Sequence, residues 1–181
     1  MRCHMQTSGV SLQREEPLSN VIRASYHGLA AVLGGAQSLN IDGYDEAYSV
    51  PSEESSILSL RNQQILEVET QATQVVDPLG GSFYVEALTN NVERKIIEEI
   101  DEIEKMGSLV EVVASGWLHR KITKYIEREQ QMIADGTIKV VARNYFRDPD
   151  LKTPDVWVQE YDENLAKEMR DKLARLRMRR D

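Results

Sequence analysis

The chain has 181 residues, of which 41% are hydrophobic and 29% are charged, so it has the composition of a globular protein and enough length to bury a core. Its 22 Lys and Arg residues against 30 Asp and Glu residues give a net charge of -8, which excludes the uniformly basic surface of a duplex nucleic-acid binder. Every apolar stretch is too short to span a bilayer, so we expect neither nucleic acid nor a membrane as a partner.

The first 70 residues predict the order strand, helix, strand, helix. Residues 2–8 predict a short strand, and apolar residues at helical spacing over 18–33 predict a helix that ends at Gly34-Gly35. Ala36–Ile41 is the second strand, and the second helix begins after Ser52, a good N-cap residue. This alternation indicates parallel strands with helices packed outside them. Two strands leave both edges unpaired, so we infer that other residues supply the rest of a larger α/β structure.

The middle of the chain, residues 73–146, is predicted to be mainly helical. A rigid turn at Asp77–Ser82 comes first, followed by a helix from about Thr89 to Met106. A short helix then begins at the capping box of Ser108 and Glu111 and ends at Gly116. Another helix continues to about Ala134, and a strand is expected over Thr137–Ala142. The last of these elements would return the chain to β structure.

A linker separates the last part of the chain from the middle part. Asp148-Pro149 and Thr153-Pro154 mark the linker, and an amphipathic helix with Tyr161 on its apolar face follows from about Gln159. The end of that helix is basic, with Lys172, Arg175, Arg177, Arg179 and Arg180. A solvated helix end that the macrodipole favours explains this charge, and a docking surface for an acidic partner is the alternative.

Cysteine and histidine are sparse. The single cysteine, Cys3, cannot form an intrachain disulfide, so the cytoplasm is the default location. The three histidines, His4, His27 and His119, form no metal-ligand spacing, and we expect no metal site.

Polar side chains gather at the end of the first predicted strand. Strand alternation places His4, Gln6 and Ser8 on one face. The carboxyl ends of strands face the active site in a parallel α/β barrel, and three polar residues there are hard to explain as packing. His4 taken alone is better explained as a hydrogen-bonded structural histidine.

The second predicted strand shows the same pattern, with Gln37, Ser38 and Asp42 near it and Glu46 four residues beyond. Gln and Ser offer neutral hydrogen bonds, and carboxylates accept hydrogen bonds from hydroxyl groups such as those of a ribose. Taken alone, Asp42-Gly43 is a common turn pair and Glu46 is explained as a solvated residue.

Several segments in fixed order then resemble the large subunit of methylmalonyl-CoA mutase. They are His4–Leu12, Leu29–Leu39, Tyr44–Ala47, Arg61–Ile65 with Glu69-Thr70, and Asp77–Thr89. The resemblance runs from Arg2 to about Asn144 and is far more specific than a single glycine motif.

The resemblance implies a TIM-type (β/α)8 barrel that binds an acyl-CoA along its axis, with adenosylcobalamin carried by a separate cobalamin-binding domain or small subunit. In that family the deoxyadenosyl radical abstracts a substrate hydrogen, the carbon skeleton rearranges, and the hydrogen returns. The cofactor supplies the chemistry, while the protein positions the reactants and excludes water.

The resemblance also assigns residues. Gln6 matches a glutamine beside the adenosyl group, Glu46 matches a glutamate on its ribose, and His4 matches a histidine that we take as the catalytic candidate. The other cofactor-binding candidates are Gln37, Ser38 and Asp42. Asp42 stands where the family has asparagine, and Asn40 stands where it has histidine, so this site departs from the family pattern.

Other parts of the family's catalytic unit have no counterpart here, including its earlier barrel strands and its cobalamin signature. We therefore expect residues 1–72 to be the last βαβα units of the barrel, residues 73–146 its helical extension, and residues 147–181 a linker and helix. A split-gene subunit, a truncated gene and an excerpt all fit, and we expect no activity without an upstream barrel fragment. Isobutyryl-CoA mutase, 2-hydroxyisobutyryl-CoA mutase and a non-catalytic assembly module are the alternatives.

Overall fold

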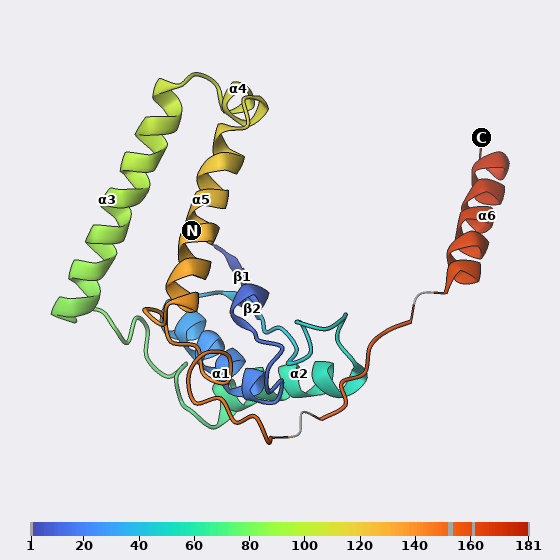
Figure 1. Cartoon of the computed structure of the whole chain (residues 1–181), viewed down its shortest axis with the longest axis horizontal. Coiled ribbons are helices and arrows are strands. Elements are labelled where there is room, and N and C mark those ends of the chain that lie inside the picture. The colour runs from blue at the N-terminus through green and yellow to red at the C-terminus, as the bar shows by residue number, and fades with distance from the viewer. Residues whose placement is uncertain (1, 152–153, 161, 181) are drawn as a thin grey trace.

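The computed structural model describes residues 2–151, 154–160 and 162–180 (Figure 1). Strands β1 (His4–Gln6) and β2 (Ser38–Asn40) alternate with helices α1 (Ser19–Leu33) and α2 (Glu53–Val68), which confirms the predicted order. The strands are parallel, with His4 opposite Ser38 and Gln6 opposite Asn40. Their carboxyl ends therefore lie at one edge of a mixed α/β unit. Both strands are shorter than predicted, because the pairing covers three residues on each side.

The core of this unit lies between α1, β2 and α2. Ala24, Ile41 and Leu66 are buried together, and Leu29 and Leu39 pack against them. Gly28 lets α1 approach the side chains of Ile41 and Leu66 closely, because a Cβ atom there would lie 2.6 Å from Ile41 Cδ1 and 2.9 Å from Leu66 Cδ1. The packing of α1 on α2 fixes the position of the loop that joins β2 to α2.

The amino terminus of α2 is held by polar contacts, as the sequence predicts for Ser52. The Ser52 side chain accepts a hydrogen bond from the backbone N–H of Ser55 at 3.1 Å. Asp45 is fully buried beside it and accepts hydrogen bonds from the Ser55 hydroxyl at 2.6 Å and from the Ser52 backbone N–H at 2.8 Å. These bonds tie the loop after β2 to the first turn of α2.

Three helices follow, α3 (Phe83–Lys105), α4 (Leu109–Ala114) and α5 (Trp117–Ala134), and α3 and α5 run side by side with α4 at the connection (Figure 1). The Lys121 ammonium of α5 bonds to Glu99 and Glu102 of α3 and lies 4.7 Å from the Trp117 ring centroid. The capping box of Ser108 and Glu111 is present, as predicted.

Helix α3 begins at Phe83, and the prediction of a start near Thr89 is wrong. Ser82 caps the helix by accepting a hydrogen bond from the Val85 N–H at 3.5 Å, and Glu86 accepts one from the Gly81 N–H at 3.1 Å. The Ser82 cap satisfies one free N–H group of the first helical turn, and the Glu86 bond holds the preceding turn, so the helix begins directly after the predicted turn at Asp77–Ser82.

The predicted strand at Thr137–Ala142 is also wrong, because these residues form a tight loop after α5. The Asn144 side chain accepts from the Val140 N–H at 2.7 Å and donates to the Ile138 carbonyl at 2.8 Å. A side chain thus takes the backbone partners that a neighbouring strand would supply. The loop contacts α1, where the Arg23 guanidinium donates to the Val141 carbonyl at 2.7 Å.

The last helix, α6 (Glu163–Arg179), begins four residues later than the predicted Gln159 and follows Asp162, which accepts a hydrogen bond from the Asn164 N–H at 2.8 Å. It lies apart from the other helices (Figure 1). The predicted linker residue Thr153 and the predicted helix residue Tyr161 lie outside the described residues.

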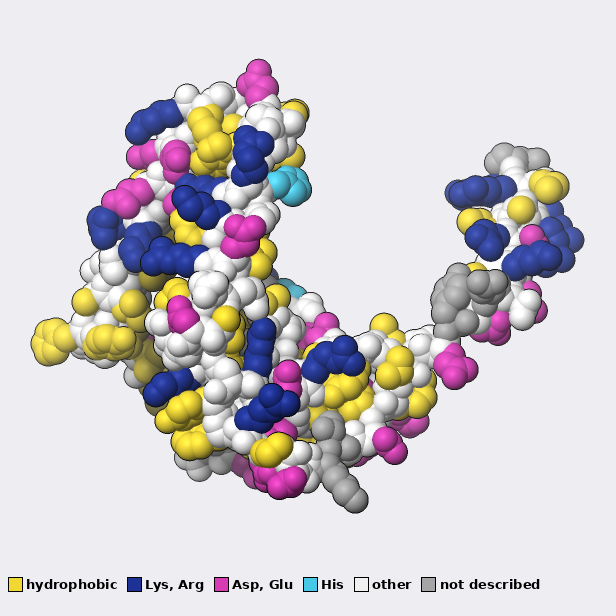
Figure 2. Space-filling model, viewed as in Figure 1, with side chains coloured by type: hydrophobic (Ala, Val, Ile, Leu, Met, Phe, Trp, Pro, Cys, Tyr) yellow, Lys and Arg dark blue, Asp and Glu magenta, His cyan; other side chains and the backbone are white. Residues whose placement is uncertain are grey.

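Many large hydrophobic side chains are open to solvent, and Figure 2 shows them between charged groups on one face of the molecule. On α3 alone, Val92, Ile96, Ile97 and Ile100 are each about half exposed. Removing such a surface from water is favourable, so this face is suited to burial against further protein.

Candidate functional site

The first part of the site joins the ends of the two strands. Gln6, the last residue of β1, donates from Nε2 to Asp42 Oδ1 at 2.8 Å. The Asp42 backbone N–H donates to the Thr7 hydroxyl at 2.9 Å. Residues 36 positions apart along the chain therefore meet at the carboxyl edge of the sheet.

Asp42 is 6% exposed, and among the described residues its Oδ2 atom has no hydrogen-bond partner. A buried carboxylate oxygen without a donor is costly, because the group has lost its water. Asp42 and Gln6 line a pocket of about 390 Å³, and Glu46 lines the same pocket from the loop that follows. A ligand hydroxyl or amine would supply the missing donor once the groups that cover Oδ2 move aside.

Glu46 lies against the segment after β1. A Cβ atom on Gly9 would lie 2.9 Å from Glu46 Cγ, so only glycine at this position leaves room for the Glu46 side chain. Glu46 is open to solvent on one side, but its partial desolvation raises its pKa, and the negative charges of Asp42 and Asp45 raise it further. The site thus concentrates hydrogen-bond acceptors and negative charge.

The raised pKa of Glu46 predicts a pH dependence of stability. The contribution of Glu46 to the free energy of unfolding is fully present below its ordinary pKa of 4.5. It is lost as pH rises through the higher pKa of the folded state, because ionisation then places a charge near two carboxylates. Glutamine at position 46 stays neutral at every pH. We therefore expect the urea midpoint of Glu46→Gln, relative to that of the wild type, to increase as pH rises from about 4 to about 8. Glu69→Gln, at an exposed glutamate, is the control, and a difference independent of pH would contradict the prediction.

Three predicted residues lie outside this pocket. His4 Nδ1 and the Ser38 hydroxyl share a hydrogen bond of 2.8 Å on paired positions of β1 and β2. Gln37 precedes β2, where its side chain accepts from the Cys3 N–H at 2.7 Å and donates to the Gly35 carbonyl at 2.5 Å. The structure therefore brings together Gln6, Asp42 and Glu46, while Gln37 lies at the opposite end of β2.

Helix α2 forms a wall of the pocket that sequence reasoning missed. Ser56, Ser59, Leu60 and Gln63 line it. Ser56, Ser59 and Gln63 are spaced three and four residues apart, which places three polar side chains on one helix face. That spacing is visible in the sequence, but it does not show which neighbour the face meets.

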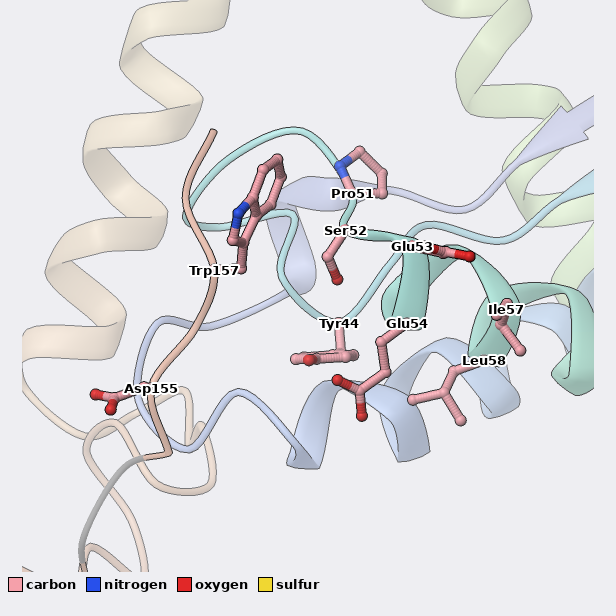
Figure 3. A pocket seen from close by; sticks show the side chains of 9 residues that line it. All are labelled: Tyr44, Pro51, Ser52, Glu53, Glu54, Ile57, Leu58, Asp155 and Trp157. Atoms are coloured by element: carbon pink, nitrogen blue, oxygen red, sulfur yellow. The ribbon is translucent and has the colours of Figure 1, made fainter. Parts of the chain in front are cut away.

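A larger hollow of about 810 Å³ lies where residues 154–160 pass the amino terminus of α2 (Figure 3). Tyr44 and Trp157 line it together with Glu53, Glu54 and Asp155. Trp157 is 54% exposed, so the hollow is open to solvent on this side. None of the predicted cofactor residues lines this hollow.

Two further observations concern the described part of the chain. No group of three or more His, Cys, Asp or Glu side chains there is arranged to hold a metal ion. No helix in residues 2–151, 154–160 and 162–180 has the length and hydrophobicity needed to cross a membrane.

Comparison with known proteins identifies the family to which the chain belongs. A family model described as methylmalonyl-CoA mutase matches residues 1–181. The chain belongs to the methylmalonyl-CoA mutase family. This confirms the resemblance seen in the sequence.

The relatives in this family include two kinds of acyl-CoA mutase. The 2-hydroxyisobutanoyl-CoA mutase large subunit of Aquincola tertiaricarbonis is 38% identical over 100% of this chain and 32% of its own length. The methylmalonyl-CoA mutase of Cereibacter sphaeroides is 44% identical over 81% of this chain and 21% of its own. The human mitochondrial methylmalonyl-CoA mutase is 37% identical over 81% of this chain. The chain thus spans between a fifth and a third of these relatives.

Proposed function

We propose that this chain forms the C-terminal part of the catalytic barrel of an adenosylcobalamin-dependent acyl-CoA mutase. The observation that carries the proposal is the meeting of Gln6, at the end of β1, with Asp42 and Glu46, from the loop after β2, in one pocket at the carboxyl edge of the parallel strands. In (β/α)8 barrels the active site lies at that edge.

The residues of the pocket fit the nucleoside part of such a cofactor. Among the residues that the structure describes, none donates to the buried Asp42 Oδ2, and Glu46 offers a second carboxylate that Gly9 allows close to β1. Two ribose hydroxyls would donate to these two acceptors once the groups that cover Asp42 Oδ2 move aside, and Gln6 would orient Asp42 through its existing bond. When bound, adenosylcobalamin supplies a carbon radical, and this chain supplies its orientation and the exclusion of water.

His4 is the proposed catalytic residue. Because side chains alternate along a strand, it shares a face of β1 with Gln6, and Ser38 fixes the orientation of its ring. Ser38 lies opposite His4 on the neighbouring strand and stays a proposed cofactor contact. Gln37 would have to give up its two backbone bonds to reach a cofactor, so among the proposed contacts it has the weakest structural support.

The incomplete sheet supports a further protein component. Within the described residues the sheet has two strands, so each strand has an unpaired outer edge, and the apolar side chains of α3 are half exposed. We propose that residues 1–72 join an upstream barrel fragment, that residues 73–146 extend that barrel, and that residues 147–181 reach towards a cobalamin-binding subunit or domain.

Nucleoside binding tests the proposed pocket on the chain itself. Adenosine titrated into the isotope-labelled protein should shift the amide resonances of Gln6, Asp42 and Gly43. Glu46→Gln should weaken the affinity for adenosine about 10- to 100-fold, because a charge-assisted hydrogen bond contributes about 1.5–3 kcal/mol. The same variant should leave the weaker affinity for 2′,3′-dideoxyadenosine unchanged.

Glu69→Gln is the matched control for this experiment, because it removes an equal charge from an exposed position that does not line the pocket. Equal weakening in both variants would show that net charge, and not the pocket, governs binding. Adenosine affinity unchanged in Glu46→Gln would remove Glu46 from the site.

The substrate is proposed at the level of an acyl-CoA, with methylmalonyl-CoA as the leading candidate. The alignment with 2-hydroxyisobutanoyl-CoA mutase covers the whole chain, including α6, which favours 2-hydroxyisobutyryl-CoA as the second candidate. Isobutyryl-CoA is a further alternative. Turnover of each acyl-CoA by this chain combined with an upstream barrel fragment and a cobalamin-binding subunit would separate them. Association without turnover would instead indicate an assembly module.

A further inference from the structure

The wall of the pocket that α2 provides is polar, and within the described chain some of its side chains have no hydrogen-bond partner. Ser59 donates its hydroxyl to the Ile41 carbonyl and is therefore used in holding α2 to β2. Ser56 and Gln63 line the same pocket, and no side-chain hydrogen bond is found for either of them within the described chain. Gln63 is half-buried, and its carboxamide is thus left to pair with water or a ligand in the part of the chain that the structure describes.

Asp42 and Glu46 line the same pocket, and apolar residues line it together with the polar groups. Ile41, Pro51 and Leu60 line the pocket as well. A pocket with apolar surfaces and a few placed polar groups is typical of a site for a small organic ligand. Flat heteroaromatic rings pack on such apolar surfaces while their edges take hydrogen bonds.

The length of the wall matches a ligand with two polar ends. Ser56 and Gln63 are seven residues apart on α2, which corresponds to a rise of about 10 Å along the helix. A ribose and an attached base extend over a comparable length. Asp42, Glu46 and Gln63 line the same pocket of about 390 Å³, so a ligand whose hydroxyls meet the two carboxylates can place its ring against α2.

We propose that Gln63 recognises the base of the nucleoside whose ribose is held by Asp42 and Glu46. The inference rests on the proposed function of the same pocket and adds the residue that selects the base. A glutamine carboxamide has a donor and an acceptor side by side, and adenine offers a ring nitrogen acceptor beside an amine donor. Gln63 would make both bonds with N7 and the 6-amine of adenine, whereas N7 and O6 of hypoxanthine are both acceptors and leave the glutamine oxygen without a donor.

Three nucleosides test this inference on the intact chain, with affinities measured by calorimetry or by amide shifts. Adenosine should bind about tenfold more tightly than inosine, because a bidentate amide contact discriminates to this extent. Gln63→Leu should reduce the adenosine preference over inosine to less than about twofold. It should keep the preference for adenosine over 2′,3′-dideoxyadenosine, which reports the ribose contacts.

Gln64→Leu is the matched control, because Gln64 is an exposed neighbour on α2 and does not line the pocket. It should retain both preferences, and far-ultraviolet circular dichroism should show equal helix content in both variants. A wild-type chain that prefers adenosine over its dideoxy analogue but not over inosine would overturn the role of Gln63 alone. The same conclusion follows if Gln63→Leu keeps the base preference. No binding of adenosine at all would overturn the proposed function together with this inference.

Discussion

Replacement of Asn20 by alanine is expected to lower the free energy of unfolding by about 3 kcal/mol. Asn20 is completely buried in α1, and its side chain accepts from the Gln13 N–H at 3.0 Å and donates to the Gln13 and Tyr44 carbonyls at 2.8 and 2.9 Å. Alanine would leave these three backbone groups buried without partners, and each such group costs about 1–3 kcal/mol before the structure relaxes.

The effect of this change should reach the site. Tyr44 lies between Asp42 and Glu46, so loss of the Asn20 bond frees the loop that carries both carboxylates. Chemical denaturation measures the stability, and Asn90→Ala on the exposed surface of α3 is the control with an expected change near zero. A loss of less than about 1 kcal/mol for Asn20→Ala would contradict this account.

Replacement of Asp45 by alanine is expected to destabilise the chain by a similar amount, about 3 kcal/mol. Asp45 is buried, and its two carboxylate oxygens are divided between the Ser55 hydroxyl and the Ser52 N–H. The variant leaves both donors unpaired at the amino terminus of α2, where the helix macrodipole also favours a negative charge. The urea midpoint measures this loss.

Two further variants define the cause. Asp45→Asn keeps the side-chain volume and one acceptor, so we expect a smaller loss than for alanine. Asp101→Ala on the exposed surface of α3 removes an equal charge and should change stability little. Equal effects of Asp45→Asn and Asp45→Ala would show that the charge itself, and not the number of acceptors, holds α2 in place.

Local chemistry in the sequence was enough to predict most of the helices and their ends. Ser52 and Ser108 each precede a helix and accept a hydrogen bond from a backbone N–H three residues later, as their residue types indicate. Such contacts depend on residues within one turn, so the printed sequence contains all of their partners. The predicted start of α3 near Thr89 is wrong because the contacts of Ser82 and Glu86 begin the helix six residues earlier, at Phe83.

By itself, the sequence determined the alternation of strands and helices, the family, and the polar residues at the carboxyl ends of the strands. Only the tertiary structure decided which of these residues share a pocket. Gln6 meets Asp42, whereas Gln37 turns to backbone groups at the other end of β2. The face of α2 that carries Gln63 lines the pocket because Leu66 packs with Ala24 and Ile41, and this packing sets the position of the helix. The physical reason is that hydrogen bonds between distant segments depend on how the core packs, which no local pattern specifies.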